Sequence, residues 1–261
     1  MTDQRATTYP LLPLRRGVML PGAVSTLPVG RARSMALVNA AKTGDLIVIA
    51  AQRQPETERP GLADIHPLAI LAKIHRIGRS NDGSARLVVE AQARVHVGEL
   101  EHSEPFLRVH ATTIEETRGD SNEAKILSES LREHIRELAG EAGGNLVEAI
   151  AKQLGPAALA DAVGAHLPLE RHAEVEVLLT TDVVDRLRLV ARFVNEAHEL
   201  HSIRKKIDEE VRSRLGKHQR EAILRERMKA IQNELSDGDD EGEVDKLRRR
   251  LAELELPEQV Q

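Results

Sequence analysis

Residues 219–235 read Gln219-Arg-Glu-Ala-Ile-Leu-Arg-Glu-Arg-Met-Lys-Ala-Ile-Gln-Asn-Glu-Leu235, and they close a proline-free segment that begins near Asp182. Apolar residues recur along this segment every three or four positions, which is the spacing of one face of an α-helix. They are Leu187, Val190, Val194, Ala197, Leu200, Ile203, Ile207, Val211, Leu215, Ala222, Met228, Ile231 and Leu235. A continuous helix from His198 to Leu235 would be about 57 Å long. Because a small domain cannot cover a helix of that length, the apolar stripe needs another partner.

The composition indicates a globular chain with an aliphatic core. Its 261 residues suffice for one large domain or two smaller ones, and 41% of them are hydrophobic. A net charge of −5 implies neither a nucleic acid nor an acidic substrate. The aromatic residues are Tyr9, Phe106 and Phe193 alone, which is too few for a base-stacking platform.

The chain carries no signal for a disulfide, a membrane span or export. It contains no cysteine, which excludes a disulfide framework and a thiolate zinc site. The amino end lacks an apolar signal core, and no apolar run approaches the ~18 residues of a membrane span. We therefore expect a cytoplasmic protein with no membrane partner.

The stretch from residue 9 to residue 117 has the pattern of short strands and tight turns. An apolar set at helical spacing lies at residues 31–42, and Asn81-Asp82-Gly83 favours a hairpin turn. The expected strands are residues 11–15, 24–29, 45–51, 68–77, 85–97 and 106–114. Together they predict a small, closed or half-closed β structure. The segment 52–67, rich in Pro and Gly, is either a partner-binding loop or a plain connection.

From residue 121 the spacing of apolar residues becomes helical. Ser121 or Asn122 is the expected N-cap of a first helix, and Asp182 is the expected cap of the long one. Between them the pattern predicts helices near residues 146–154, 157–166 and 169–180, which would form a compact bundle. Residues 1–8 are expected to be disordered. After Leu235 comes an acidic linker, 236–261, with a short helix near 244–254.

The motifs of common catalytic sites do not occur. There is no phosphate-binding Gly-x4-Gly-Lys-Ser/Thr loop, no Gly-x-Gly-x-x-Gly and no Gly-x-Ser-x-Gly. His198 and His201 lie one helical turn apart without a third ligand nearby, so we predict no metal site, no cofactor site and no catalytic residue in this chain. Arg31 with Arg33, and the cluster at 204–206, could contact phosphates, although solvated charged faces are the favoured interpretation.

Three blocks of sequence together resemble the Lon family of ATP-dependent proteases. The first is Leu12-Pro13-Leu14-Arg15 with Pro21-Gly22 and Leu27-Pro28-Val29-Gly30-Arg31; the second is Leu159-Ala-Asp-Ala-Val-Gly-Ala-His-Leu-Pro-Leu169; the third is the run 219–235. The resemblance is to the N-terminal region of a bacterial Lon protease. It implies an α+β fold, with a β-rich, PUA-like pseudo-barrel at 9–117, a helical bundle at 121–197 and a long coiled-coil-like helix at 198–235. The linker 236–261 would then lead towards an AAA+ module outside the chain.

The resemblance also implies a function. This chain would be the substrate-recognition and oligomer-assembly region of a serine protease that degrades misfolded and regulatory proteins. The full-length protein would be a homohexamer that uses ATP and Mg, carries its Ser-Lys dyad outside this chain, and could contact DNA. Two alternatives stay open: a stand-alone, non-enzymatic adaptor with the same domain, and a nucleic-acid-binding coiled-coil protein.

Candidate contact residues follow from these expectations. Apolar residues at strand ends or turns could bind exposed apolar segments of unfolded protein clients, although each could equally belong to the core. They are Pro21, Leu27, Val29, Leu68 and Ile70. On the long helix, Leu224, Met228, Ile231 and Leu235 are expected to contact a neighbouring protomer, with a plain dimeric coiled coil as the alternative. Gly216 is a candidate hinge, because glycine costs about 1 kcal/mol in a helix interior relative to alanine.

Overall fold

The computed structural model describes residues 7–80, 83–142, 155–238 and 249–250. The chain divides into two units, Met1–Glu199 and Leu200–Gln261. The division lies close to His198, the predicted start of the long helix. The predicted β domain and helical bundle both belong to the first unit.

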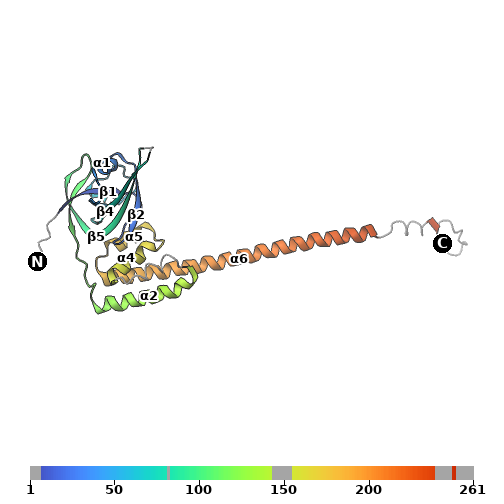
Figure 1. Ribbon diagram of the computed structural model, residues 1–261. Helices are drawn as coiled ribbons and strands as arrows, with labels where there is room; N and C mark the ends of the chain where they lie inside the picture. The colour runs from blue at the N-terminus through green and yellow to red at the C-terminus, as the bar shows by residue number, and fades with distance from the viewer. Residues whose placement is uncertain (1–6, 81–82, 143–154, 239–248, 251–261) are drawn as a thin grey trace. The chain divides into compact units, whose positions relative to one another are not determined.

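A six-stranded sheet forms the β part of the first unit (Figure 1). Its strands are β1 (Thr7–Leu14), β2 (Val24–Val29), β3 (Leu46–Ala51), β4 (Leu68–Arg79), β5 (Ala85–His102) and β6 (Arg108–Thr113). The order is β2-β5-β4-β3-β1-β6, and β6 also pairs with β5, so five of the strands close into a ring. Only the β1–β3 pair is parallel among the described strands. Of the two predicted forms, closed and half-closed, the structure has the closed one.

The long strand β5 makes the closure possible because it pairs with three neighbours. Its first part pairs with β2, its last part with β6, and β4 runs along much of its length. Register shifts interrupt both the β4–β5 and the β5–β6 ladders, and such bulges bend and twist a strand as a small barrel requires. At one of them a Cβ on Gly98 would lie 3.2 Å from the carbonyl oxygen of His110, which only glycine avoids.

The connections between the strands differ in detail from the expectations. Helix α1 (Ala32–Ala40) lies within the predicted helical stretch and buries Leu37 and Val38. The 52–67 segment contains a short 3-10 helix, η1 (Leu62–Asp64). Strand β1 begins at Thr7, inside the stretch expected to be disordered, because Thr7 and Thr8 pair with β6. In the predicted hairpin turn, Gly83 has the expected positive φ of 80°, while residues 81 and 82 lie outside the described residues.

Four of the described α-helices follow the last strand of the sheet. They are α2 (Asn122–Ala142), α4 (Pro156–His166), α5 (Arg171–Leu179) and α6 (Val183–Gly238). The two predicted caps are present. The Ser121 hydroxyl accepts a hydrogen bond from the Ala124 amide at 3.1 Å, and the Asp182 carboxylate accepts from the amides of Val184 and Asp185 at 3.0 and 3.1 Å. The helix predicted at 146–154 lies outside the described residues. Of the helix predicted at 244–254, the structure describes only 249–250, which are helical.

Two apolar clusters form the core of the first unit. One takes residues from every strand of the closed ring, including Leu11, Val48, Leu71, Val95 and Val109. The other joins the sheet to α1, α2, α4, α5 and α6, and this shared core explains why the β part and the bundle are one unit. Its sheet and α1 members include Leu12, Ile49, Ile74, Leu87 and Val38; its later helical members include Leu131, Leu159, Val177, Leu187 and Val190.

A buried ion network connects the same parts. Arg94 on β5 donates to both carboxylate oxygens of Asp161 on α4, at 2.8 and 2.6 Å, and to Glu116 at 3.0 Å. Arg186 on α6 donates to Glu116 at 2.6 Å. Arg94 and Asp161 are 2% and 1% exposed and Arg186 is 0% exposed, while the Glu116 side chain is 29% exposed, so two positive and two negative groups balance one another and only Glu116 reaches solvent. Burial raises the pKa of Asp161, and the hydrogen bonds from Arg94 oppose that rise.

Helix α6 changes its surroundings along its length. Its side chains belong to the core as far as Val194, and α2 lies beside its first turns (Figure 1), where Arg188 hydrogen-bonds Glu123. In the second unit the described apolar side chains are about half exposed or more. They are Leu200, Ile203, Ile207, Val211, Ile223, Leu224, Met228 and Ile231. Among the described residues, no helix has both the length and the apolar character needed to cross a membrane.

Candidate functional site

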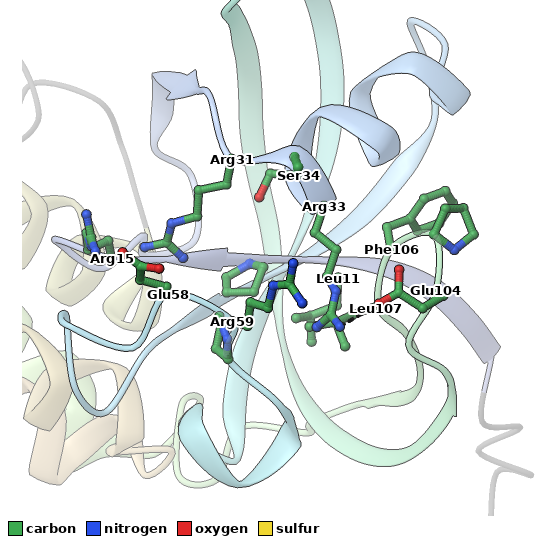
Figure 2. Close-up of a pocket in the computed structure, with 14 residues that line it drawn as sticks. Leu11, Arg15, Arg31, Arg33, Ser34, Glu58, Arg59, Glu104, Phe106 and Leu107 are labelled. Atoms are coloured by element: carbon green, nitrogen blue, oxygen red, sulfur yellow. Dashed lines mark hydrogen bonds and ion pairs between the residues drawn. The ribbon is translucent and has the colours of Figure 1, made fainter.

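A pocket of about 440 Å³ opens on the first unit, over strand β1 (Figure 2). Its walls are the start of α1, the loop at 58–60 and the segment 104–107, which precedes β6. Leu11, Pro13, Pro60, Phe106 and Leu107 supply apolar lining, and four arginines and two glutamates supply charge. A pocket of this size lies within the range of small-molecule sites and has room for two or three side chains of a peptide.

Arg31 is the most constrained of the charged residues. It is the N-cap residue of α1, and its Nη1 donates to the side-chain oxygen of Gln52 at 2.8 Å. Its Nη2 is buried and has no hydrogen-bond partner in the structure. Burial lowers the pKa of Arg31, and the neighbouring Arg15 lowers it further, while Glu58 acts in the opposite direction. An unpaired N–H in such a place is costly, so an incoming acceptor would be favoured there.

Positive charge is in surplus around Arg31. Arg33 donates to Glu104 at 2.8 Å, which neutralises one of the four arginines. Arg15 donates only to the uncharged Pro55 carbonyl, at 2.6 Å, and Arg59 has no carboxylate partner within the described part of the chain. Figure 2 shows Arg31 and Arg33 reaching from the start of α1 towards β1, with Arg59 between them and Glu58 near Arg15.

The start of α1 adds to this positive character. No acidic residue lies in its first turn, and no side chain among those described caps it. Ala32, Arg33 and Ser34, whose backbone N–H groups precede the first α-helical hydrogen bond at Met35, line the pocket. Free N–H groups at a helix start favour an anion.

Gln52 holds the pocket wall in place. It is fully buried, and its side-chain nitrogen donates to the carbonyls of Gln54 and Thr57 while its oxygen accepts from Arg31. Its backbone carbonyl accepts from Arg171 at the start of α5. The loop that carries Glu58 and Arg59 is therefore fixed against both α1 and the bundle.

The arrangement can bind a ligand through both charge and apolar contact. The lining combines guanidinium donors with an apolar surface, and it contains no histidine and no adjacent nucleophile–base pair. Throughout the described residues, no three His, Asp or Glu side chains come together as a metal site would require, and this includes the surroundings of His198 and His201.

The five residues predicted to contact clients lie elsewhere in the first unit. Pro21, Leu27 and Leu68 are half-buried, whereas Val29 and Ile70 are 5% and 1% exposed and belong to the core. None of these five described residues lines the pocket. Val29 and Ile70 therefore have no surface to offer in this structure.

The predicted contact residues of the long helix are at the surface of the second unit. Leu224, Met228 and Ile231 are 64%, 62% and 55% exposed. The side chain of Leu235 lies outside the described part, and the backbone is helical at both Leu235 and Gly216. The clustered cations at 204–206 lie on exposed positions of the same helix.

Sequence reasoning noticed part of the pocket. It singled out Arg31 and Arg33 as a pair and the 52–67 segment as an ambiguous loop, but it did not connect them to one another. Arg15, Arg59 and Glu104 were missed because only the closed sheet brings them to α1. The available signal was local: four arginines, at 15, 16, 31 and 33, occur within nineteen residues of a chain that is acidic overall.

Comparisons with known proteins agree with the fold. The family model described as the ATP-dependent protease La (LON) substrate-binding domain matches residues 8–196. Lon protease 4 of Sorangium cellulosum (strain So ce56) is 46% identical over 254 residues, and Lon protease 1 of Bacillus subtilis (strain 168) is 31% identical over 265. The alignments cover 97% and 100% of this chain but 32% and 34% of those proteins. The chain thus spans about a third of the length of these curated relatives.

A solved structure has the same fold. The N-terminal domain of Mycobacterium avium complex Lon protease aligns with a TM-score of 0.60 at 22% identity, over 72% of this chain and 98% of that one. The matched share of the chain is comparable to the length of the first unit, which ends at Glu199.

Proposed function

The chain belongs to the family of Lon substrate-binding domains, and from this membership we propose that its first unit recruits unfolded protein segments for an ATP-dependent protease. The pocket over β1 carries the proposal, because its apolar floor and hydrogen-bonding rim are open on the domain that the family model matches. Unfolded clients expose apolar side chains and unpaired backbone groups, and such a pocket can bind both without a strict sequence requirement. Pro21, Leu27 and Leu68 are further candidate contacts, and Val29 and Ile70 would support them from the core.

Photo-crosslinking tests the recruiting role directly. A photoreactive amino acid is placed at the exposed position Arg59 and, as a control on the second unit, at the exposed position Arg225. A reduced and alkylated protein should label at Arg59 in preference to Arg225, and the same protein in its folded form should label neither. Equal labelling by the folded and unfolded forms would contradict recruitment of unfolded clients.

The second unit is proposed to serve in assembly. Its exposed apolar stripe, with Leu224, Met228 and Ile231, would pack against the same helix of a neighbouring protomer, since exposed apolar side chains at helical spacing favour helix pairing. Met228→Asp should raise the dissociation constant of self-association by about tenfold or more. Asn233→Asp adds the same charge at an exposed position off this stripe and should leave the constant within about twofold. Sedimentation of the 1–261 chain measures both, and equal effects of the two substitutions would count against the stripe.

Gly216 is proposed as a hinge within this helix. Gly216→Ala should stabilise the helix locally by about 1 kcal/mol, which slows amide exchange of the surrounding residues about fivefold. A helix that needs to bend while protomers exchange partners should then exchange them more slowly. Unchanged subunit exchange, despite slower amide exchange, would leave Gly216 as a tolerated glycine and remove the hinge.

The role of a complete protein follows from the same family. We propose a homohexameric, cytoplasmic protease that removes misfolded and regulatory proteins in quality control and the stress response. ATP and Mg would act on an AAA+ module, and a Ser-Lys dyad would cut the client, all outside residues 1–261. The reading frame downstream of Gln261 tests this: a phosphate-binding loop within roughly the next hundred residues supports the protease, and a stop codon supports a stand-alone adaptor. Contact with DNA is testable as binding that weakens steeply with salt.

A further inference from the structure

The charges of the pocket do not cancel within the protein. Arg33 is paired with Glu104, and Glu58 lies near Arg31, yet Arg15 and Arg59 have no carboxylate partner among the described side chains. The buried Nη2 of Arg31 also lacks an acceptor. Four guanidinium groups therefore face two carboxylates, and one donor is both desolvated and unpaired. A bound, negatively charged acceptor would balance the surplus positive charge and pair with the free N–H of Arg31.

The shape of that acceptor is restricted by the geometry. A guanidinium presents planar, paired N–H donors that match the two oxygens of a carboxylate. The free N–H groups at the start of α1 favour negative charge at the same end of the pocket. Glu58 and Glu104 limit how much negative charge the ligand can carry. Their own charges repel a ligand with several negative charges, such as a nucleic acid. A single carboxylate fits this balance.

The apolar lining restricts what the carboxylate is attached to. The accessible apolar lining is supplied by Pro13 and Phe106, which are half-buried, and by Pro105, which is exposed, whereas Leu11 and Leu107 are almost fully buried. A free carboxylate ion would leave this surface exposed to water, whereas a neighbouring aliphatic or aromatic side chain would cover it. The volume of about 440 Å³ has room for a carboxylate together with one or two such side chains.

We infer that this pocket selects client segments in which one carboxylate stands next to apolar side chains, and that Arg31 and Arg59 bind the carboxylate. The inference rests on the proposed recruiting function and adds a chemical preference to it. The carboxylate could come from an Asp or Glu side chain or from the carboxyl terminus of a client. Both sources offer the same two oxygens, and the experiment separates them.

The test uses four fluorescent peptides and the full 1–261 chain. The first pair, dansyl-Ala-Leu-Phe-Asp-Leu-Ala-amide and the same peptide with Asn for Asp, varies a side-chain carboxylate. The second pair, dansyl-Ala-Ala-Leu-Phe-Leu as free acid and as amide, varies a terminal one. Fluorescence anisotropy measures each dissociation constant. The acid member of at least one pair should bind about tenfold more tightly than its neutral member, since a hydrogen bond to a charged group is lost in the latter.

Variants locate the effect. Arg31→Gln should abolish the preference for the acid, and Arg59→Gln, at an exposed position that leaves the core untouched, should reduce it about threefold. Arg16→Gln is the matched control, because Arg16 is exposed, adjacent to Arg15 in sequence and outside the pocket lining, and it should change nothing. Glu104→Gln should act in the opposite direction and strengthen acid binding about threefold, because Arg33 then loses its competing partner.

The outcomes are distinguishable. Equal binding of acid and neutral peptides overturns the carboxylate preference and leaves recruitment standing. A preference that survives both Arg31→Gln and Arg59→Gln overturns the assignment to this pocket. Failure of all four peptides to bind, together with absent crosslinking at Arg59, overturns the recruiting function as well.

Discussion

Arg94 and Asp161 lie 67 residues apart in sequence and form a bidentate ion pair inside the first unit. Asp161→Asn would leave Arg94 and Arg186 sharing Glu116 alone. Because an unbalanced buried charge is costly, we expect a loss of about 3 kcal/mol in the free energy of unfolding, measured by urea denaturation. Glu101→Gln, which breaks the exposed pair with Arg108 at 3.0 Å, should cost less than about 0.5 kcal/mol. If Asp161→Asn lowered the free energy of unfolding by less than Glu101→Gln does, the structural role of the buried pair would be contradicted.

The double variant Arg94→Met with Asp161→Leu separates the cost of an unbalanced buried charge from the cost of losing the ion pair itself. It removes one cation and one anion and leaves Arg186 paired with Glu116 at 2.6 Å. A buried pair replaced by apolar residues of similar volume is often close to neutral in stability. The double variant should therefore cost less than Asp161→Asn alone, and a double-mutant cycle measures the difference. Additive costs would show that the two residues do not act as a pair.

Asp182 combines a helix cap with an ion pair. A hydrogen bond from Arg118 at 2.5 Å holds the pKa of Asp182 well below its usual range, against the opposing effect of burial, and Thr117 contributes further. A carboxyl with a lowered folded pKa stabilises the protein above its unfolded pKa, near 4, and loses this contribution as the pH falls towards its folded value. Asp182→Asn keeps an oxygen for the cap but removes the charge.

We expect Asp182→Asn to lower stability by about 1 kcal/mol at pH 7, since the pair is partly exposed to solvent. The difference from the unsubstituted chain should stay constant down to about pH 5 and shrink below about pH 4. Thermal unfolding at several pH values, in low and high salt, measures it. If the stability difference grew on acidification, the pKa of Asp182 would not be lowered in the folded protein.

Residues with local signals were predicted from sequence, and residues with distant partners were not. Asp182 was predicted as a cap, and Ser121 was one of two candidates with Asn122, because the capping amides lie two or three residues away. Asp161 was passed over, although it is a single charge within the apolar run 159–163. Its partner Arg94 comes from a strand whose pairing only the closed sheet defines. The arginines of the pocket were missed for the same reason.

At the scale of elements, α4 approaches its neighbours closely at Gly164. A Cβ there would lie 3.2 Å from Leu20 Cδ1 and 3.3 Å from Val177 Cγ1. Gly164→Val should therefore lower the free energy of unfolding by about 1–3 kcal/mol through overpacking, despite the higher helix propensity of valine. Gly30→Ala is the control, because no atom lies within 4 Å of its Cβ position and its φ is not positive. Denaturant unfolding that ranks the two in the reverse order would contradict this packing.

The strands and helices themselves were largely predictable. Alternating apolar residues and Pro or Gly turns located all six strands, because each signal lies within a few residues. Strand β5 runs to His102, beyond the predicted end at 97, since its last part pairs with β6 across a bulge. Ring closure by β5 and β6 depends on contacts between distant residues, so sequence periodicity could suggest a closed structure without giving its strand order.

At the scale of the whole molecule, the β part and the bundle share a core. The sequence pattern predicts a β domain, 9–117, followed by a helical bundle, 121–197. In the structure both contribute to one apolar cluster and to the Arg94–Asp161 network, while the other cluster lies within the β part. The linker at 117–121 changes composition without separating cores, and composition alone could not reveal this.

Truncation tests this division at the scale of the whole chain. The fragment 1–199 contains both apolar clusters and the buried ion network, so it should unfold in one cooperative step and bind client peptides as the full chain does. The fragment 1–117 should not fold cooperatively, because it lacks Asp161, Arg186 and the helical half of the shared core. The fragment 200–261 should be only partly helical in isolation, since its exposed stripe has no core to cover it. Circular dichroism with urea titration measures all three, and a cooperative transition of 1–117 equal to that of 1–199 would contradict the shared core.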